Sequence, residues 1–311
     1  MSESPTTATN PRILIVGNAG QLGRELEKTF AGFGPVVGVD RESVDLADAA
    51  QTRELVRRTA PDIILNAAAY TAVDRAETER DLAYAINEQA PRVLAEEALR
   101  RSALFVHYST DYIFDGGKTE PKSIPWIETD PPNPLNVYGA SKLAGERAVE
   151  NTGGKYLIFR TSWVYGPHGN NFLLTMLRLA RERDRLSIVD DQIGGPTTSI
   201  ELARATHSIV TGILAGRLGA PEDWAGLYHM TCGGSVSWFG FAQAIFARSA
   251  EKLAIKPPTL TPISTKDYPT PAARPRYSVL SNAKLHARFG VELSSWESAL
   301  EETLQALRNA N

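Results

Sequence analysis

Short unbroken runs of apolar residues recur along the first half of the chain, separated by stretches in which apolar positions return every three or four residues. The apolar runs lie at 12–17, 36–40, 62–69, 104–114 and 156–166. Runs of this length are typical of strands that are buried on both faces, and the spacing between them predicts helices, as at 20–30, 45–59 and 81–101. Strands that alternate with helices predict an α/β fold, a doubly wound, Rossmann-like parallel sheet with helices on both faces.

This alternation stops after Gly166, and the pattern predicts three parts. Residues 1–10 are polar and are expected to form a disordered tail, whereas 11–166 are expected to form a dinucleotide-binding domain. Residues 167–311 mix helical stretches with short strands and Pro-rich loops. They predict a smaller, irregular, mainly substrate-binding part that returns some elements to the main sheet.

Composition removes several classes of partner. A formal charge of -3 gives no electrostatic reason to expect nucleic acid, and no apolar run is long enough to span a bilayer. Cys232 is the only cysteine, so no intrachain disulfide forms. The polar N-terminus also lacks the features of a signal peptide. These observations favour a cytoplasmic protein with neither membrane nor nucleic acid as a partner.

Three glycines join the first predicted strand to the first helix. Gly17, Gly20 and Gly23 permit a tight turn and close approach of a pyrophosphate, while the helix N-terminus offers amide donors. An ordinary Gly-rich turn is the alternative. Asp40 ends the second strand, where a carboxylate can bind the adenosine ribose. Arg41 beside it can bind a 2′-phosphate instead, so NADH and NADPH both stay open as cofactors.

A phenol and an ammonium lie four residues apart, at Tyr138 and Lys142, on a stretch that follows a Pro-rich run and reads as a helix. An isolated tyrosine is a poor acid at neutral pH, and a nearby ammonium favours its ionised form. The pair therefore predicts a proton shuttle, with chance spacing as the alternative. Thr110 and Asp111 follow the fourth strand, at the edge where open α/β sheets bind ligands, although such residues are also common turn formers.

These residues together resemble the extended short-chain dehydrogenase/reductases. The longer strings "HYSTDYIFDG", "PLNVYGASKLAGE", "FRTSWVYG", "GNNF", "DDQIGGPT" and "YPTPAARP" resemble the dTDP-4-dehydrorhamnose reductase family within that superfamily, from Arg12 to the C-terminus. The resemblance implies reduction of the C4 ketone of dTDP-4-dehydro-β-L-rhamnose to dTDP-L-rhamnose with NADPH or NADH. This reaction is the last step of dTDP-rhamnose biosynthesis.

The same resemblance implies roles for individual residues. Tyr138 would give a proton to the ketone oxygen, Lys142 would lower the Tyr138 pKa and hold the nicotinamide ribose, and Thr110 would hydrogen-bond the same oxygen. The implied cofactor contacts are Gly17, Gly20, Gln21, Leu22, Gly23, Asp40, Asp45, Leu46, Ala69, Tyr70, Thr71, Tyr108 and Lys142. The implied substrate contacts are Thr110, Asp111, Tyr138, Trp163, Asn171 and Arg274.

Several alternatives belong to neighbouring functions. A 4,6-dehydratase places an Asp-Glu pair directly after the threonine, whereas here Asp111 is followed by Tyr112, which favours simple reduction. An epimerase, a reductase for another nucleotide sugar, and a non-catalytic regulatory subunit of the same fold also stay open. The full set of Thr110, Tyr138 and Lys142 speaks against the regulatory subunit.

Metal binding rests on the resemblance alone. The five histidines show no ligand spacing, which speaks against a zinc site. The resemblance implies Mg²⁺ at a subunit contact of a homodimer, held by Glu25, Glu201 and Glu297. Three solvated acids are the alternative.

Overall fold

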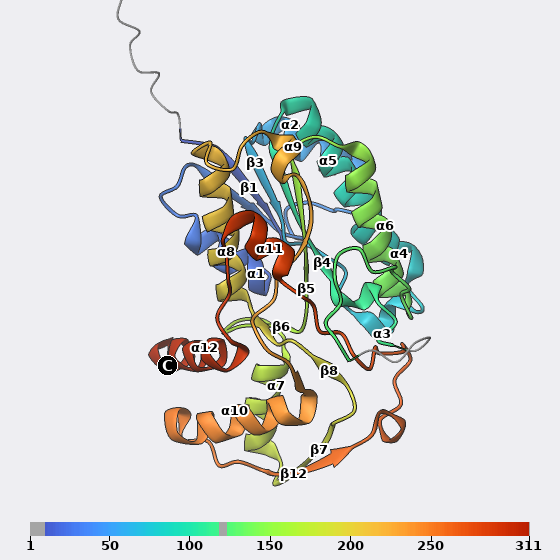
Figure 1. Cartoon of the computed structure of the whole chain (residues 1–311), viewed down its shortest axis with the longest axis vertical. Coiled ribbons are helices and arrows are strands. Elements are labelled where there is room, and N and C mark those ends of the chain that lie inside the picture. Colours follow the sequence, from blue (N-terminus) through green and yellow to red (C-terminus); the bar gives the residue numbers. More distant parts are fainter. Residues whose placement is uncertain (1–9, 118–122, 311) are drawn as a thin grey trace, which may run out of the picture.

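The computed structural model describes residues 10–117 and 123–310 (Figure 1). The disordered tail expected at residues 1–10 falls, except for residue 10, outside the described residues.

The main sheet confirms the predicted fold class. Within the described residues it has the strand order β10-β5-β4-β3-β1-β2, and each neighbouring pair is parallel. Its strands are β1 (Ile13–Val16), β2 (Val36–Val39), β3 (Ile63–Asn66), β4 (Leu104–Thr110), β5 (Tyr156–Thr161) and β10 (Gly226–His229). The predicted strand at 104–114 ends at Thr110, because a short 3-10 helix, η2 (Asp111–Ile113), begins there.

Two hydrophobic clusters lie on opposite faces of this sheet, as the alternation of side chains along β1 requires. Ile13 and Ile15 join the cluster that contains residues of α1 (Gln21–Thr29) and α8 (Ser199–Leu214). Leu14 and Val16 join the cluster that contains residues of α2 (Ala49–Thr59), α5 (Ala90–Arg101) and α6 (Val137–Thr152). The helices on both faces are seen in Figure 1. Because the strands of the main sheet are parallel, their carboxyl ends lie together, between the two layers of helices.

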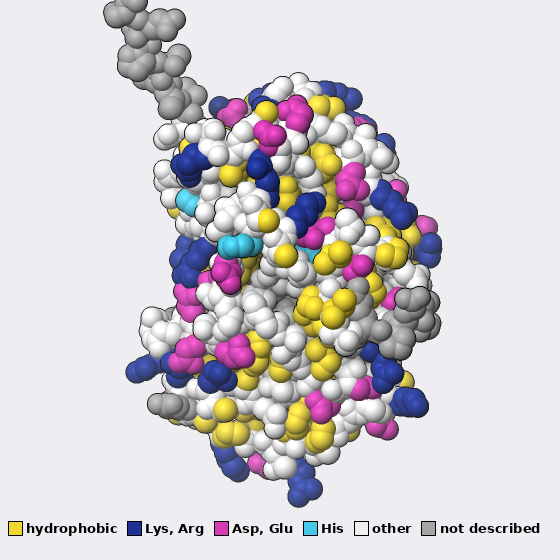
Figure 2. All heavy atoms as spheres, viewed as in Figure 1, with side chains coloured by type: hydrophobic (Ala, Val, Ile, Leu, Met, Phe, Trp, Pro, Cys, Tyr) yellow, Lys and Arg dark blue, Asp and Glu magenta, His cyan; other side chains and the backbone are white. Residues whose placement is uncertain are grey.

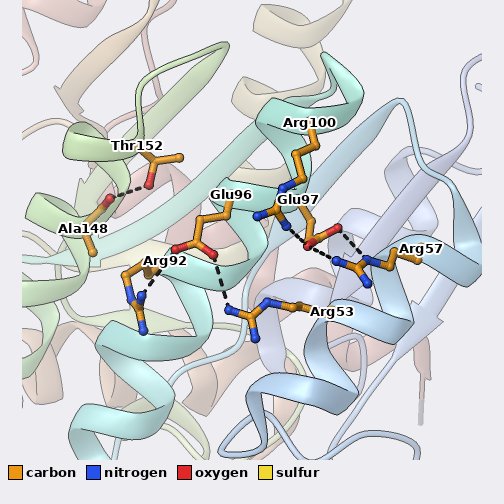
Figure 3. Close-up of polar contacts among 8 residues, drawn as sticks. All are labelled: Arg53, Arg57, Arg92, Glu96, Glu97, Arg100, Ala148 and Thr152. Carbon is orange, nitrogen blue, oxygen red and sulfur yellow. Dashed lines mark hydrogen bonds and ion pairs between the residues drawn. The ribbon is translucent and has the colours of Figure 1, made fainter.

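A group of ion pairs joins α2 to α5 (Figure 3). Glu97 of α5 accepts two hydrogen bonds from the Arg57 guanidinium, at 3.1 and 3.0 Å, and also contacts Arg100. Glu96 pairs with Arg53 at 3.5 Å and with Arg92 at 3.3 Å. These ion pairs link the two helices in addition to the apolar packing between them.

The chain after residue 166 contributes to both ends of the molecule. β10 belongs to the main sheet, and α8 belongs to one of its helical layers. α7 (Phe172–Glu182), α10 (Trp238–Leu253) and α12 (Trp296–Ala310) gather at the other end of Figure 1. The division at residue 166 stays a prediction.

Small sheets and short helices complete the fold. The pairs are β7 (Arg185–Val189) with β12 (Thr259–Ile263), β8 (Ile193–Gly194) with β11 (Val236–Ser237), and β6 (Val164–Tyr165) with β9 (Thr197–Thr198). The short helices are α3 (Val73–Ala76), α4 (Arg80–Tyr84), the π-helix η1 (Ala85–Gln89), α9 (Pro221–Trp224), the 3-10 helix η3 (Thr265–Asp267) and α11 (Ala283–Phe289).

The surface has no strong bias of charge on the face drawn in Figure 2, where basic and acidic side chains are interspersed. Across 10–117 and 123–310, no helix has the length and apolar character needed to cross a membrane.

Candidate active site

The turn between β1 and α1 is built for close approach. Gly17 has a φ of +87°, which side chains rarely tolerate, and a Cβ there would lie 2.8 Å from the Ala68 backbone nitrogen. A Cβ on Gly23 would collide with the Gly17 carbonyl oxygen. Gly20 is the N-cap of α1 and supplies no side-chain acceptor, so the first amide groups of the helix keep their donors for a ligand. The turn therefore fits a cofactor pyrophosphate.

Asp40, the predicted contact of the adenosine ribose, lies next to this turn, because the Val39 carbonyl before it accepts hydrogen bonds from the Gly17 and Asn18 amides. Asp40 follows β2 directly, and its Oδ1 accepts a hydrogen bond of 3.0 Å from the Glu42 amide. Asp45 makes the same kind of turn, and its Oδ1 accepts a hydrogen bond of 2.9 Å from the Ala47 amide. Leu46 packs on the α2 side of the sheet. Within the described residues the hydrogen bonds to the Asp40 carboxylate all reach its Oδ1, so its second oxygen remains available to a ribose hydroxyl.

The segment after β3 is fixed by a residue that the sequence did not single out. Asn87, fully buried in η1, accepts 2.8 Å from the Tyr70 amide and donates 3.1 Å to the Tyr70 carbonyl. It also donates 3.0 Å to the Ser141 hydroxyl of α6. Asn87 thus joins the segment holding Ala69, Tyr70 and Thr71 to the helix of Tyr138. The interrupted helical geometry at η1 has no visible signal in one sequence, and π-helical turns are frequent at functional sites.

Thr110 and Tyr138 meet at the carboxyl end of β4. The Thr110 hydroxyl lies close enough to the Tyr138 phenol to affect its pKa, and the Tyr138 ring packs edge-on against Tyr112, with centroids 5.5 Å apart. Burial raises the pKa of Tyr138 to about 12, although the approach of the Thr110 hydroxyl acts to lower it. The sequence predicted a lowering by Lys142. The net shift is upward because loss of water around the phenol outweighs its polar contacts, and Tyr138 is therefore a protonated acid.

Lys142 lies one helical turn farther along α6 and points into the sheet. Its Nζ donates 2.7 Å to the Tyr108 carbonyl and lies 3.4 Å from Nε2 of His107. Burial lowers the pKa of Lys142 to about 8, and the charge of Glu146 opposes this. Tyr108 thus presents its carbonyl to the site, whereas its hydroxyl lies 2.7 Å from Thr206 of α8.

Trp163 follows β5 with a φ of +45°, a left-handed conformation that a bulky side chain seldom adopts. Its ring stacks on Trp238 of α10, with centroids 3.5 Å apart and planes 5° from parallel. A Cβ on Gly194 would strike the Trp163 ring, so the glycine leaves the room for it. Backbone strain of this kind clusters at functional sites. Sequence reasoning selected Trp163 but not its partner Trp238.

The other predicted substrate contacts are engaged within the chain. Asn171 is the N-cap of α7, and its amide donates 2.9 Å to Gln21 beside the glycine turn. Arg274 pairs with Asp74 of α3 at 2.9 Å and donates 2.9 Å to the Ala272 carbonyl. Arg274 also lies near enough to Tyr112 to affect its pKa electrostatically, so it faces the same corner as Tyr138.

The predicted metal ligands are not gathered in one chain. Glu25 lies 4.0 Å from His168, Glu201 accepts 3.0 Å from the Ser294 amide, and Glu297 lies in the first turn of α12. Among the described residues, no cluster of three acids, histidines or cysteines is arranged to hold a metal. A site completed by a second subunit stays a prediction.

The glycine turn, the strand-end Thr110 and the Tyr138–Lys142 pair on one helix define the class of this protein. It is an extended short-chain dehydrogenase/reductase.

Comparisons with known proteins identify the family within that class. The chain matches the family model described as RmlD substrate binding domain over residues 11–309. It is 48% identical to a dTDP-4-dehydrorhamnose reductase of Burkholderia thailandensis, over 93% of this chain and 96% of that protein. It is 44% identical to a protein of the same name from Salmonella typhimurium, over 94% and 96%.

A solved structure agrees. The dTDP-4-dehydrorhamnose reductase of Bacillus anthracis, in complex with NADP, superposes with a TM-score of 0.86 at 37% identity, covering 96% of this chain and 100% of that one. The chain belongs to the dTDP-4-dehydrorhamnose reductase family, and the predicted family is confirmed.

Proposed function

We propose that this protein reduces the C4 ketone of dTDP-4-dehydro-β-L-rhamnose to dTDP-L-rhamnose with NADPH or NADH, the last step of dTDP-rhamnose biosynthesis. The observation that carries the proposal is the approach of the Tyr138 and Thr110 side chains to each other at the carboxyl end of β4. Two hydroxyl groups converge there, as a ketone oxygen that becomes an alcohol requires. The names and coverage of the relatives support the choice of substrate.

The glycine turn supports the cofactor. Gly17, Gly20 and Gly23 leave space for a pyrophosphate at the start of α1, and Asp40 lies where the adenosine ribose would be bound. The nicotinamide, when bound, supplies the hydride. The NADP complex of the Bacillus anthracis relative supports this class of cofactor.

The proton that the ketone oxygen receives comes from a side chain of the protein. Because burial keeps Tyr138 protonated, its phenol donates a hydrogen bond to the ketone oxygen and transfers the proton as negative charge develops there. Thr110 contributes a second hydrogen bond to the same oxygen. Lys142, fixed by the Tyr108 carbonyl, supplies a cation one turn from the phenolate that forms and is the group proposed to hold the nicotinamide ribose.

The remaining assignments are part of the same proposal. Residues 11–166 bind mainly the cofactor and 167–311 mainly the nucleotide sugar, with Asp111, Trp163, Asn171 and Arg274 on the sugar side. We place the protein in the cytoplasm as a homodimer, with Mg²⁺ at the subunit contact. Sedimentation of the protein with and without Mg²⁺ tests the last point, because an unchanged monomer removes both the dimer and the ion.

The central experiment follows the absorbance of reduced nicotinamide after adding enzymatically prepared dTDP-4-keto-6-deoxy sugar. Tyr138→Phe is expected to lower kcat by roughly 10³-fold without a comparable rise in KM. Tyr112→Phe is the matched control, because it removes a neighbouring phenol oxygen to which no proton transfer is assigned. Equal activity of the wild type and Tyr138→Phe would contradict the proposal. Analysis of the sugar product separates reduction from epimerisation, and a UDP-linked ketone tests the choice of nucleotide.

A further inference from the structure

The hydrogen of the Thr110 hydroxyl is already engaged. Its Oγ1 accepts a hydrogen bond of 3.2 Å from the Tyr112 amide, and its hydrogen is donated to Oδ1 of Asp111, also over 3.2 Å. A hydroxyl has one hydrogen and two lone pairs. Thr110 therefore cannot donate to a ketone oxygen while its hydrogen stays on Asp111.

Asp111 lies in an environment where its charge is poorly compensated. The residue is 1% exposed, its Oδ2 makes no hydrogen bond of normal geometry to the described residues, and only the hydroxyls of Thr110 and Ser278 lie near enough to offset its charge. The titratable groups that face it are the phenols of Tyr112 and Tyr138. Beyond them, Arg274 is paired with Asp74. The structure thus offers the Asp111 carboxylate no direct cationic partner within its described part.

The protonation state of Asp111 follows from that environment. Burial raises the pKa of Asp111 to about 7, and the hydroxyls of Ser278 and Thr110 act to lower it. Both forms of the carboxyl group are therefore populated near neutral pH. An ionised Asp111 accepts the Thr110 hydrogen. A neutral Asp111 carries its own hydrogen and can donate it to the lone pair of Thr110 that the Tyr112 amide leaves free.

We propose that Asp111 is a positioning residue whose proton sets the direction of the Thr110 hydroxyl, so that the neutral acid releases that hydroxyl to donate to the substrate ketone. The inference rests on the proposed function and deepens it. No covalent bond to carbon changes in this step, and the Asp111 proton stays on Asp111 through turnover. The role is distinct from contact between Asp111 and the sugar.

The test is the pH dependence of kcat/KM, from about pH 5.5 to about pH 9, for the wild type and Asp111→Asn. The wild type is expected to lose about tenfold as pH rises through 7, since one donor to the oxyanion is withdrawn. An Asn amide can donate to Thr110 at every pH, so Asp111→Asn should lack this step and keep only the loss near pH 8 that belongs to Lys142.

Two further variants keep the inference open to refutation if Asp111→Asn folds poorly. Thr110→Val has a similar shape but no hydroxyl, so it should be slow at all pH values and show no step near 7. Ser278→Ala removes a hydroxyl that lowers the Asp111 pKa, so its step should move to higher pH while its activity at low pH is retained. A step that persists in Thr110→Val, or that stays unchanged in Asp111→Asn, overturns the proposal.

The outcomes separate this inference from the function beneath it. A wild type that never oxidises the cofactor with the dTDP-linked ketone refutes the proposed function and the inference together. A wild type that turns over with a pH profile identical to that of Asp111→Asn refutes the inference alone.

Discussion

The contact between α2 and α5 (the joint) and the site at the end of β4 beside Tyr138 (the corner) each contain a buried carboxyl group. The pKa values of these two groups are shifted in opposite directions. Glu97 is 2% exposed and receives hydrogen bonds from the Arg57 guanidinium, with Arg100 nearby, and the pKa of Glu97 is lowered by these contacts (Figure 3). Asp111 is equally buried, has no such partner, and its pKa is raised. Burial alone therefore does not decide the charge of a buried acid.

The difference separates a structural use of charge from a functional one. A carboxylate whose pKa is lowered stays ionised across the neutral range and behaves as a fixed link. Asp111 at about 7 and Lys142 at about 8 change charge within reach of neutral pH. Groups with shifts of this kind are concentrated at catalytic sites. The corner beside Tyr138 has the character of a proton-handling site, whereas the joint between α2 and α5 does not.

Among changes to the charged groups of these two regions, the largest expected effect comes from removing the cation beside Tyr138. Lys142→Met should lower kcat/KM by about 10² to 10³-fold, equivalent to about 3 to 4 kcal/mol, because the forming Tyr138 phenolate loses its nearby positive charge. In the wild type the ammonium is present below about pH 8 and lost above it, so kcat/KM should fall through that pH. Steady-state kinetics against pH measures both. If kcat/KM of Lys142→Met still falls as pH rises through 8, that fall belongs to another titrating group.

Much of the fold could be predicted from the chain alone, because apolar runs report burial directly. The runs at 12–17 and 62–69 became β1 and β3, with every residue of both strands buried. β10 is different. Its residues, Gly226–His229, lie in an irregular stretch, and their place beside β5 comes from a long-range pairing with no local pattern.

The candidate site could be predicted where the type and spacing of a residue indicate its chemistry, as with Gly17, Tyr138 and Lys142. The contacts that tune these residues were not. The rise in the Tyr138 pKa comes from burial by the assembled fold, and the link from Asn87 to Tyr70 depends on a π-helical turn. Such effects depend on tertiary packing, which spacing in one sequence does not encode.

The second prediction sharpens the comparison through stability. Since Asp111 binds its proton more tightly when folded, its contribution to the free energy of unfolding falls as pH rises from about 4 to about 7. Asp111→Asn should therefore be more stable than the wild type above pH 7, by about 2 kcal/mol, with the gain vanishing below about pH 4. Urea unfolding at several pH values measures this. A variant that is less stable than the wild type at pH 8 would show that the carboxylate has a compensating partner.

The third prediction has the opposite sign of pH dependence. Because contacts with Arg57 lower the pKa of Glu97 in the folded protein, its stabilisation is full above the unfolded pKa near 4.5 and is lost as pH falls through the lower folded value. Glu97→Gln should cost about 1 to 1.5 kcal/mol at pH 7 and little in acid. The same unfolding series measures it, and kcat should be unchanged. A loss that grows in acid would reverse the contrast with Asp111.

The smallest expected effect is at the solvent edge of the same joint. Arg53 pairs with Glu96 at 3.5 Å, their side chains are 36% and 26% exposed, and Glu96 keeps Arg92 at 3.3 Å if Arg53 is lost. Arg53→Ala should cost less than about 0.5 kcal/mol, because solvent already screens an exposed pair. Unfolding at low and high salt measures it, with Glu97→Gln as the buried reference. A cost above about 1 kcal/mol that disappears in salt would mean that the ion pairs of α2 and α5 act as one network, and that even the exposed members of the joint are structural charges.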